Sequence, residues 1–186
     1  MANRGTGKSN LRLFVALDSP SGVCAEVAGW ARQAAGSDRR MRPVPAHNCH
    51  ITLAFIGEAA ESTVASIDEA IESSAAPIAG LSLGVPVWLP RRRPRALALE
   101  VHDGRGELQA CHLRLAEALG EAIGWESERR FRPHLTAIRL GRGVLPGETP
   151  LPVSPALDFD GEAVTLYRSE LLPEGARYDP LVRVGL

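Results

Sequence analysis

The segment His50-Ile-Thr-Leu53 recurs 84 residues later as His134-Leu-Thr-Ala137, and this repeat organises the expected fold. In each copy polar and apolar residues alternate, which is typical of a strand with one face in the core and one face toward solvent. The alternation places each histidine and its threonine together on one face, with the aliphatic residues on the other. The repeat therefore predicts two rigid surfaces that each present an imidazole and a hydroxyl.

Strands and helices alternate around the repeat. Apolar patterning predicts strands over 11–17, 49–56, 81–87, 96–101, 131–140 and 163–171, followed by a short strand in the tail. Apolar residues at helical spacing predict three helices: one from Asp18-Ser-Pro20 to Gly36, one beginning near Glu61, and one over 108–122 that ends before Gly124. This order predicts a mixed α and β fold, and we expect the first half of the chain to form one lobe and the second half another.

Composition and charge limit the classes of protein that fit. The 186 residues are 45% hydrophobic and 23% charged, which predicts one globular domain or two closely packed lobes and excludes disorder throughout. The net charge is −1, so overall charge gives no reason to expect a nucleic acid or a membrane as partner. An anionic partner would need a local basic cluster. All the basic residues except Lys8 are arginine, whose planar fork matches phosphate.

Three cysteines, Cys24, Cys49 and Cys111, are far apart in the sequence and lack a paired spacing. They predict neither a disulfide framework nor a cysteine-based zinc site. No stretch approaches the roughly 18 to 20 apolar residues of a membrane span, and the polar first residues lack the apolar core of a signal peptide. We therefore expect no membrane segment, a cytoplasmic location, and a single domain over residues 11–186 after a flexible leader of residues 1–10.

The paired motifs suit displacement at phosphorus. One neutral imidazole, at His50 or His134, would accept a proton from attacking water while the other, protonated, would donate a proton to the leaving oxygen. The hydroxyls of Thr52 and Thr136 could donate hydrogen bonds to the phosphate oxygens whose charge grows in the transition state. Neither motif contains a second ligand at the usual metal spacing, so we expect no metal and no other cofactor, although Cys49 adjoins His50.

Beyond the repeat, several segments resemble one known family. The chain is similar to the two-histidine phosphoesterase superfamily, and within it to the RNA 2′,3′-cyclic phosphodiesterases, also called 2′-5′ RNA ligases. The resemblance covers about residues 11–186, in the family's order. It rests on Arg12-Leu-Phe-Val-Ala-Leu-Asp18, Asn48-Cys-His-Ile-Thr-Leu-Ala-Phe-Ile-Gly-Glu58, Pro90-Arg-Arg-Arg-Pro-Arg-Ala-Leu97, Phe131-Arg-Pro-His-Leu-Thr136 and Leu166-Tyr-Arg-Ser169.

The resemblance implies an α+β fold with two lobes. A pseudo-two-fold pair of antiparallel sheets, with the helices outside, would contribute one motif strand each to a central cleft. It also implies metal-independent hydrolysis of a terminal 2′,3′-cyclic phosphate to a 2′-phosphomonoester, with reversible ATP-independent 2′-5′ ligation in some members. By the family pattern His50 would protonate the departing 3′ oxygen, His134 would activate water, and Thr52 and Thr136 would hold the phosphate.

Arginines extend the candidate site. Arg139 matches a basic position that the family often shows after the second motif, but simple alternation places it on the face opposite His134 unless the strand bulges. Exposed basic clusters could bind an RNA backbone, or could be merely solvated. The candidates are Arg91, Arg92, Arg93 and Arg95 between two strands, Arg129, Arg130 and Arg132 before the second motif, and Arg39, Arg40 and Arg42 before the first.

Three interpretations of the paired motifs remain. We expect a phosphodiesterase acting on RNA ends that carry a 2′,3′-cyclic phosphate, and we expect a monomer. The same residues could instead hydrolyse a small cyclic nucleotide of that kind. A third interpretation is a module that binds RNA ends without turnover and uses the histidines only as hydrogen-bond donors.

Overall fold

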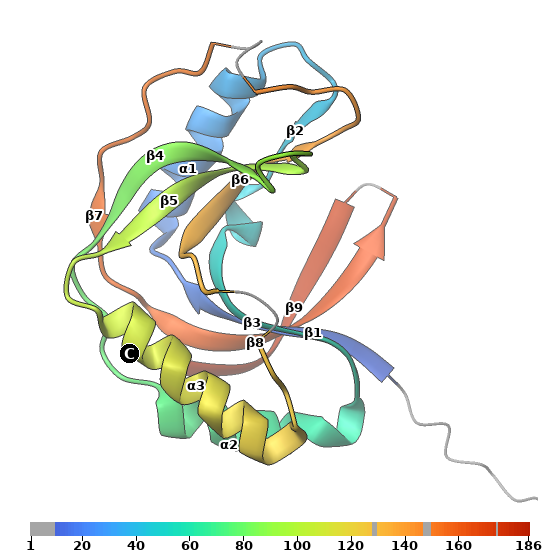
Figure 1. Ribbon diagram of the computed structural model, residues 1–186, viewed down its shortest axis with the longest axis vertical. Coiled ribbons are helices and arrows are strands. Elements are labelled where there is room, and N and C mark those ends of the chain that lie inside the picture. The colour runs from blue at the N-terminus through green and yellow to red at the C-terminus, as the bar shows by residue number, and fades with distance from the viewer. Residues whose placement is uncertain (1–9, 128–129, 147–149, 174) are drawn as a thin grey trace, which may run out of the picture.

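The computed structural model describes residues 10–127, 130–146, 150–173 and 175–186 (Figure 1). The expected flexible leader, residues 1–10, lies outside this part of the chain except for Asn10, where β1 begins. The strands are β1 (Asn10–Asp18), β2 (Met41–Pro43), β3 (His50–Ala60), β4 (Leu81–Leu89), β5 (Ala96–Asp103), β6 (His134–Leu140), β7 (Asp158–Phe159), β8 (Ala163–Leu172) and β9 (Gly175–Gly185). The helices are α1 (Ser21–Ala35), α2 (Val64–Ser74) and α3 (Glu107–Ile123), with short 3-10 turns η1 (Ala46–Asn48) and η2 (Glu61–Thr63).

The strands form one antiparallel path in the order β7-β4-β5-β6-β3-β1-β8-β9, and β2 also pairs with β6. The path has two halves, which we call the terminal lobe (β1, β3, β8 and β9) and the middle lobe (β2, β4, β5, β6 and β7). Among the described residues, β3 and β6 pair at one position only, Ile51 with Leu135. The expected α+β fold is therefore present, and its two antiparallel sheets are joined at this single position.

The expected division of the chain into a first-half lobe and a second-half lobe is wrong. In the terminal lobe β1 pairs with β3 on one edge and with β8, from the end of the chain, on the other. The middle lobe is built from the segment between them. The reason lies in β1, where Leu13–Leu17 are all buried. A strand that is apolar on both faces belongs in the interior of a sheet, so it needs a partner on each edge.

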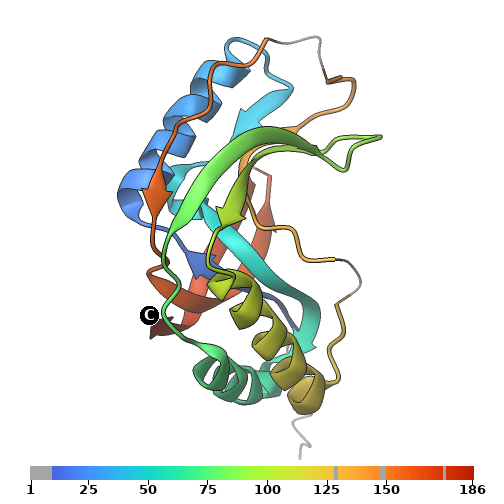
Figure 2. The same ribbon diagram turned by 60° about the vertical axis from the view of Figure 1, so that its left-hand side comes forward.

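The helices cover the outer faces of the curled sheet, as Figures 1 and 2 show from two directions. Helix α1 packs against β2 and β6 of the middle lobe, whereas α2 and α3 pack against each other and against strands of the terminal lobe. Helices α1 and α3 end where glycines with positive φ, Gly36 and Gly124, terminate them as expected. The motif side chains therefore belong to the inner face of the curled sheet, away from the helices.

Several strand boundaries differ from the expectation; β3, for example, extends to Ala60 instead of ending at Ile56. Strand β6 begins at His134 instead of Phe131, because Pro133 has no N–H for a ladder and the Phe131 ring stacks on His112 at 4.1 Å between centroids. Strand β9 is longer than the short tail strand expected and pairs with β8 along its whole length. None of the described helices combines the length and the apolar character needed to cross a membrane.

Candidate active site

The two motif strands meet at the joint between the lobes. Ile51 and Leu135 are direct partners in an antiparallel ladder. His50 therefore lies on the side of this pair where Thr136 lies, and Thr52 lies on the side where His134 lies. Ile51 and Leu135 are fully buried, while the four motif side chains are partly buried on the opposite face. The structure therefore brings both histidines and both threonines together on one surface.

Each motif strand carries a bulge immediately after its threonine. On β3, Thr52 pairs with Ala16 and Ala54 pairs with Val15, so Leu53 is the extra residue. Since a bulge inserts one residue, the alternation of faces is shifted beyond it. The ring of Phe55 consequently returns to solvent, with 51% of its surface exposed.

The bulge on β6 answers the question about Arg139. Thr136 pairs with Ala98 and Ile138 pairs with Leu97, so Ala137 is the extra residue. The shift returns Arg139 to the face of His134, and its side chain lines the same cavity as Thr136. Arg139 and Phe55 thus occupy the same position, five residues after the motif histidine, in the two lobes.

His112 of α3 holds the first bulge. Its Nδ1 lies 3.0 Å from the carbonyl oxygen of Leu53, and because a carbonyl can only accept, Nδ1 carries the proton. The same ring stacks on Phe131, just before the second motif strand. His112 is buried, and it ties the first bulge to the segment that leads into β6.

The two motif histidines are anchored in the same way. Nδ1 of His50 lies 2.9 Å from the carbonyl oxygen of Asn48, and Nδ1 of His134 lies 2.7 Å from the carbonyl oxygen of Arg132. Each Nδ1 must therefore donate, which fixes the tautomer and the ring orientation. Nε2 remains as the free nitrogen of each ring, a proton acceptor when the ring is neutral and a donor when it is charged.

His50 is enclosed by aromatic rings. Phe14 lies 4.9 Å and Tyr178 5.3 Å from it, centroid to centroid, with Tyr178 edge-on. Burial lowers the pKa of His50 to about 4; the hydrogen bond to Asn48 and the charge of Asp18 oppose this, and the charge of Arg139 reinforces it. The protonated form of His50 therefore depends on a nearby negative charge.

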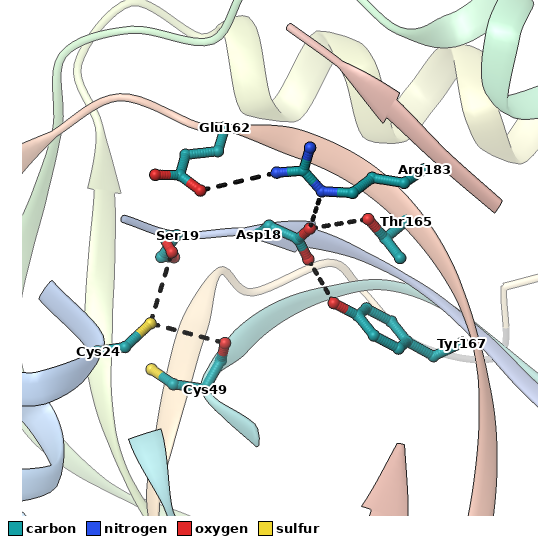
Figure 3. Close-up of polar contacts among 8 residues, drawn as sticks. All are labelled: Asp18, Ser19, Cys24, Cys49, Glu162, Thr165, Tyr167 and Arg183. Atoms are coloured by element: carbon teal, nitrogen blue, oxygen red, sulfur yellow. Dashed lines mark hydrogen bonds and ion pairs between the residues drawn. The ribbon is translucent and has the colours of Figure 1, made fainter. Parts of the chain in front are cut away.

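Asp18 supplies such a charge through a built network (Figure 3). It is the direct ladder partner of His50, on the neighbouring strand β1. Its carboxylate accepts hydrogen bonds from the hydroxyls of Thr165 and Tyr167, both at 2.8 Å, and from Nε of Arg183 at 3.2 Å. Burial, reinforced by the hydrogen bond to this carboxylate and by its charge, raises the pKa of Tyr167, so its hydroxyl stays a donor.

His134 has a basic environment instead. Burial lowers its pKa, and the charges of Arg139 and Arg132 lower it further against the hydrogen bond to the Arg132 carbonyl. Its direct ladder partner is also a carboxylate, Glu100, but that group forms an ion pair with Arg132 at 3.3 Å. The arrangement favours a neutral imidazole at His134.

A cavity of about 780 Å³ opens beside the motif strands, within the range of small-molecule sites. It is bounded by β2, β6 and the hairpin of β8 and β9, and its lining includes His50, Thr136 and Tyr178. Five arginines line it, and no aspartate or glutamate is among the described residues that do; the arginines are Arg12, Arg42, Arg95, Arg139 and Arg177. This is the local positive surface that an anion needs on a nearly neutral protein.

Several predicted RNA-binding arginines lie elsewhere. Arg91, Arg92 and Arg93 are exposed on the loop between β4 and β5, and they are not part of the cavity wall described above. Arg130 is exposed outside that wall, and Arg132 is held by Glu100. Arg129 lies outside the described residues.

Residues missed as site candidates come mainly from pairings that are distant in sequence. Asp18 and Tyr178 reach His50 through β1 and β9, and Arg12 and Arg177 reach the cavity through β1 and the β8–β9 hairpin. Only the segment that contains Arg12 and Asp18 carried a signal, through its family resemblance. No group of three or more His, Cys, Asp or Glu side chains in the described chain is placed to hold a metal ion.

Comparison with known proteins shows a family and several relatives to which the chain is similar. A family model described as the 2′-5′ RNA ligase superfamily matches residues 19–170. A relative from Thermus thermophilus named RNA 2′,3′-cyclic phosphodiesterase is 29% identical, covering 95% of this chain and 90% of the relative. A relative of the same name from Escherichia coli is 29% identical, covering 94% of this chain and 96% of the relative.

Solved structures show the same architecture. A crystal structure of a Thermus thermophilus protein matches with a TM-score of 0.81 and 27% identity, covering 95% of this chain and 98% of the other. The crystal structure of Escherichia coli LigT complexed with 3′-AMP matches with a TM-score of 0.78 and 27% identity, covering 96% of this chain and 99% of the other. The overall fold is thus shared with these proteins over nearly the whole chain.

Proposed function

This chain belongs to the 2′-5′ RNA ligase superfamily, and we propose that it is a metal-independent RNA 2′,3′-cyclic phosphodiesterase producing a 2′-phosphomonoester. The names of its relatives support this activity. The observation that carries it is the matched pair of imidazoles on strands joined at one ladder position, each with Nδ1 committed to a carbonyl and Nε2 free. Such a pair suits one acid and one base acting together.

In the proposed reaction, Nε2 of His134 accepts a proton from water as the water oxygen bonds to phosphorus. The bond between phosphorus and O3′ breaks, and the Nε2 proton of His50 passes to O3′. The ring opens to a 2′-phosphate and a free 3′-hydroxyl, with one water consumed. Solvent exchange returns both imidazoles to their starting protonation states.

The surroundings of the histidines support this division of roles. The Asp18 carboxylate favours a charged His50, against burial and the charge of Arg139, which together keep the pKa of His50 low in the free protein; His134 has no such carboxylate among the causes of its shift, and Arg139 and Arg132 favour its neutral form. Burial lowers the pKa of both rings, so the anionic substrate itself supplies the charge that raises the pKa of His50 on binding. His50 is thus protonated, and able to act as the acid, when the phosphate is bound.

The growing charge on phosphate has three proposed partners. Thr52 and Thr136 donate hydrogen bonds to the non-bridging oxygens, and the guanidinium of Arg139 compensates the charge from the same face of β6. Beyond the cavity, the exposed arginines 91–93, 130 and 132 are proposed contacts for the RNA backbone. Ring opening by a 5′-hydroxyl in place of water, with O3′ again the leaving group, would give the 2′-5′ ligation, and the reverse step would regenerate the cyclic phosphate.

A single assay tests the activity. Purified protein with a chelator is incubated with an RNA oligonucleotide ending in a 2′,3′-cyclic phosphate, beside His50→Ala, His134→Ala and, as a matched control, His102→Ala from the exposed part of β5. We expect a terminal 2′-phosphate from the wild type and the control only. Folded protein without product, or activity that is lost to the chelator and restored by one metal, would contradict the proposal.

The proposal includes the setting of the enzyme. We place it in the cytoplasm as a monomer, where reducing conditions keep Cys24, Cys49 and Cys111 as thiols. Sedimentation of the pure protein tests the monomer, and a fluorescent fusion tests the location. A mononucleotide substrate is the alternative within the same chemistry.

A further inference from the structure

Three of the cavity arginines lie side by side on adjacent strands. Arg42 of β2 is the direct ladder partner of Arg139 on β6. On the other edge of β6, Arg139 pairs with Ala96, and Arg95 directly precedes that residue. The main chain of Arg95 is fixed on both sides, since its N–H donates to the Leu89 carbonyl at 2.8 Å and its carbonyl accepts from Leu140 at 2.9 Å.

This row of arginines has no acidic partner among the residues that the structure describes. Among the described residues, Arg42, Arg95 and Arg139 form no ion pair, whereas Arg132, Arg168, Arg177 and Arg183 each pair with a carboxylate. Like charges placed directly opposite each other in a ladder are destabilising. A free energy cost retained at the wall of a cavity indicates that an anion offsets it during function.

A single bound phosphate could not contact all three arginines and the motif histidines at once. The reacting phosphate lies near His50, His134 and the threonines, and Arg139 is three residues, or about 10 Å of strand, beyond Thr136. The bulge at Ala137 shortens that span, so Arg139 reaches back toward the reacting phosphate. Arg42 and Arg95 flank Arg139 on the two edges of β6, level with it or one residue beyond it along the strands, which leaves them for a second anion.

The chemistry of an RNA end identifies that anion. The cyclic phosphate occupies O2′ and O3′ of the terminal ribose, so the chain leaves through O5′, and the next phosphate is attached there. We propose that Arg42 and Arg95 form a subsite for the phosphate on O5′ of the terminal nucleoside. The subsite rests on the proposed function, and it makes the enzyme selective for ends that carry this second phosphate over a bare nucleoside 2′,3′-cyclic phosphate.

Three substrates separate the possibilities. They are a nucleoside 2′,3′-cyclic phosphate, the same molecule with a 5′-phosphate, and a dinucleotide with a 2′,3′-cyclic end. We expect the wild type to turn over the second and third with kcat/KM at least about tenfold above the first, since a charged hydrogen-bonded contact is worth that much. A preference for the dinucleotide over the 5′-phosphorylated mononucleotide would identify the diester as the natural ligand, and the reverse order would identify a terminal phosphate.

Variants assign the preference to residues. Arg42→Gln and Arg95→Gln should each lower kcat/KM for the two phosphate-bearing substrates about five- to tenfold more than for the bare one, and Arg42→Lys should restore part of the difference. Each Gln variant should also weaken the dependence of KM on salt by about one ionic contact. Arg105→Gln, in the exposed turn at the opposite end of β5, is the matched control and should keep the wild-type preference.

The outcomes of the two proposals differ. Equal kcat/KM for all three substrates in the wild type, or an equal loss on all three in Arg42→Gln, would overturn the subsite while leaving the phosphodiesterase intact. Failure of the wild type to open any of the three rings would overturn the proposed function and the subsite with it. Circular dichroism establishes that each variant is folded, as expected for substitutions of exposed side chains.

Discussion

The two motif strands, β3 and β6, share their backbone and differ in their surroundings. Both carry a bulge after the threonine, both hold the histidine Nδ1 against the carbonyl two residues earlier, and both place a carboxylate opposite the histidine. Around His50, however, the neighbours are aromatic rings and an anchored Asp18, while around His134 they are arginines. The comparison teaches that the backbone sets the positions of both imidazoles, whereas the neighbouring side chains give the two rings different electrostatic surroundings.

The largest expected effect is the loss of kcat in the two histidine variants, and a change of leaving group should distinguish them. His50→Ala and His134→Ala should each lower kcat by about 10²- to 10⁴-fold on an ordinary 2′,3′-cyclic phosphate. A substrate with sulfur in place of O3′ needs no acid, because a thiolate leaves without protonation. On it, His50→Ala should recover most of the wild-type rate and His134→Ala should not. Recovery by His134→Ala instead would reverse the assigned roles.

The equivalent positions after the bulges give the next effect. Arg139→Gln should lower kcat about 10²-fold, because it removes a charged donor from the growing negative charge. Phe55→Leu, at the same position in the other lobe, should change kcat by about twofold or less. Steady-state kinetics on one cyclic oligonucleotide compare them. Equal losses of kcat in Arg139→Gln and Phe55→Leu would mean that the residues after both bulges contact the phosphate.

Removing the charge of each carboxylate opposite a histidine should affect kcat differently, with a large loss at Asp18 and little change at Glu100. Asp18→Asn keeps the volume and an acceptor oxygen but removes the charge that favours protonated His50, so kcat should fall about tenfold and the pH optimum should move to lower pH. Glu100→Gln should change kcat by about twofold and leave the optimum in place. The pH–rate profiles of both variants are the measurement. In Asp18→Glu, which keeps the charge, the pH optimum should lie closer to that of the wild type than in Asp18→Asn. An unchanged optimum in Asp18→Asn would remove Asp18 from the acid function.

The smallest effect concerns stability. The folded-state pKa of His50 is lowered to about 4, below its unfolded value, so the unfolded chain binds the extra proton between about pH 6.5 and 4. Stability should therefore fall as pH falls through this window. His50→Gln should flatten the dependence more than His134→Gln, because His50 has the larger shift. Urea unfolding at pH 7 and pH 5 measures it, and a steeper dependence in His50→Gln would contradict the assignment.

The sequence was sufficient for the features that repeat locally. The His-x-Thr pattern placed four side chains on one surface, and apolar periodicity located the main strands and helices. It was insufficient where partners are far apart in the chain. The pairing of β1 with β8 depends on both edges of a buried strand, and nothing near Asp18 in sequence indicates that Thr165 and Tyr167 will bind it.

Arginine positions show the same limit. The segment from Pro90 to Arg95 was recognised as a basic loop, but which of its arginines lines the cavity depends on its joining to β5. Arg95 is held by ladder-like bonds at the strand entrance, whereas Arg91–Arg93 extend beyond it. The bulge at Ala137 is likewise invisible in sequence, because a small apolar residue fits a regular strand and a bulge equally well.

The single ladder pair between Ile51 and Leu135 has a mechanical consequence. If one lobe rotates against the other, this pair is the fulcrum, and a displacement grows with the distance from it. His50 and His134 adjoin the fulcrum, so their separation would hardly change, while the hairpin of β8 and β9 and the wall with Arg42 would swing through the widest arc. The spacing between the two motif histidines therefore depends on the one position at which the two sheets are joined.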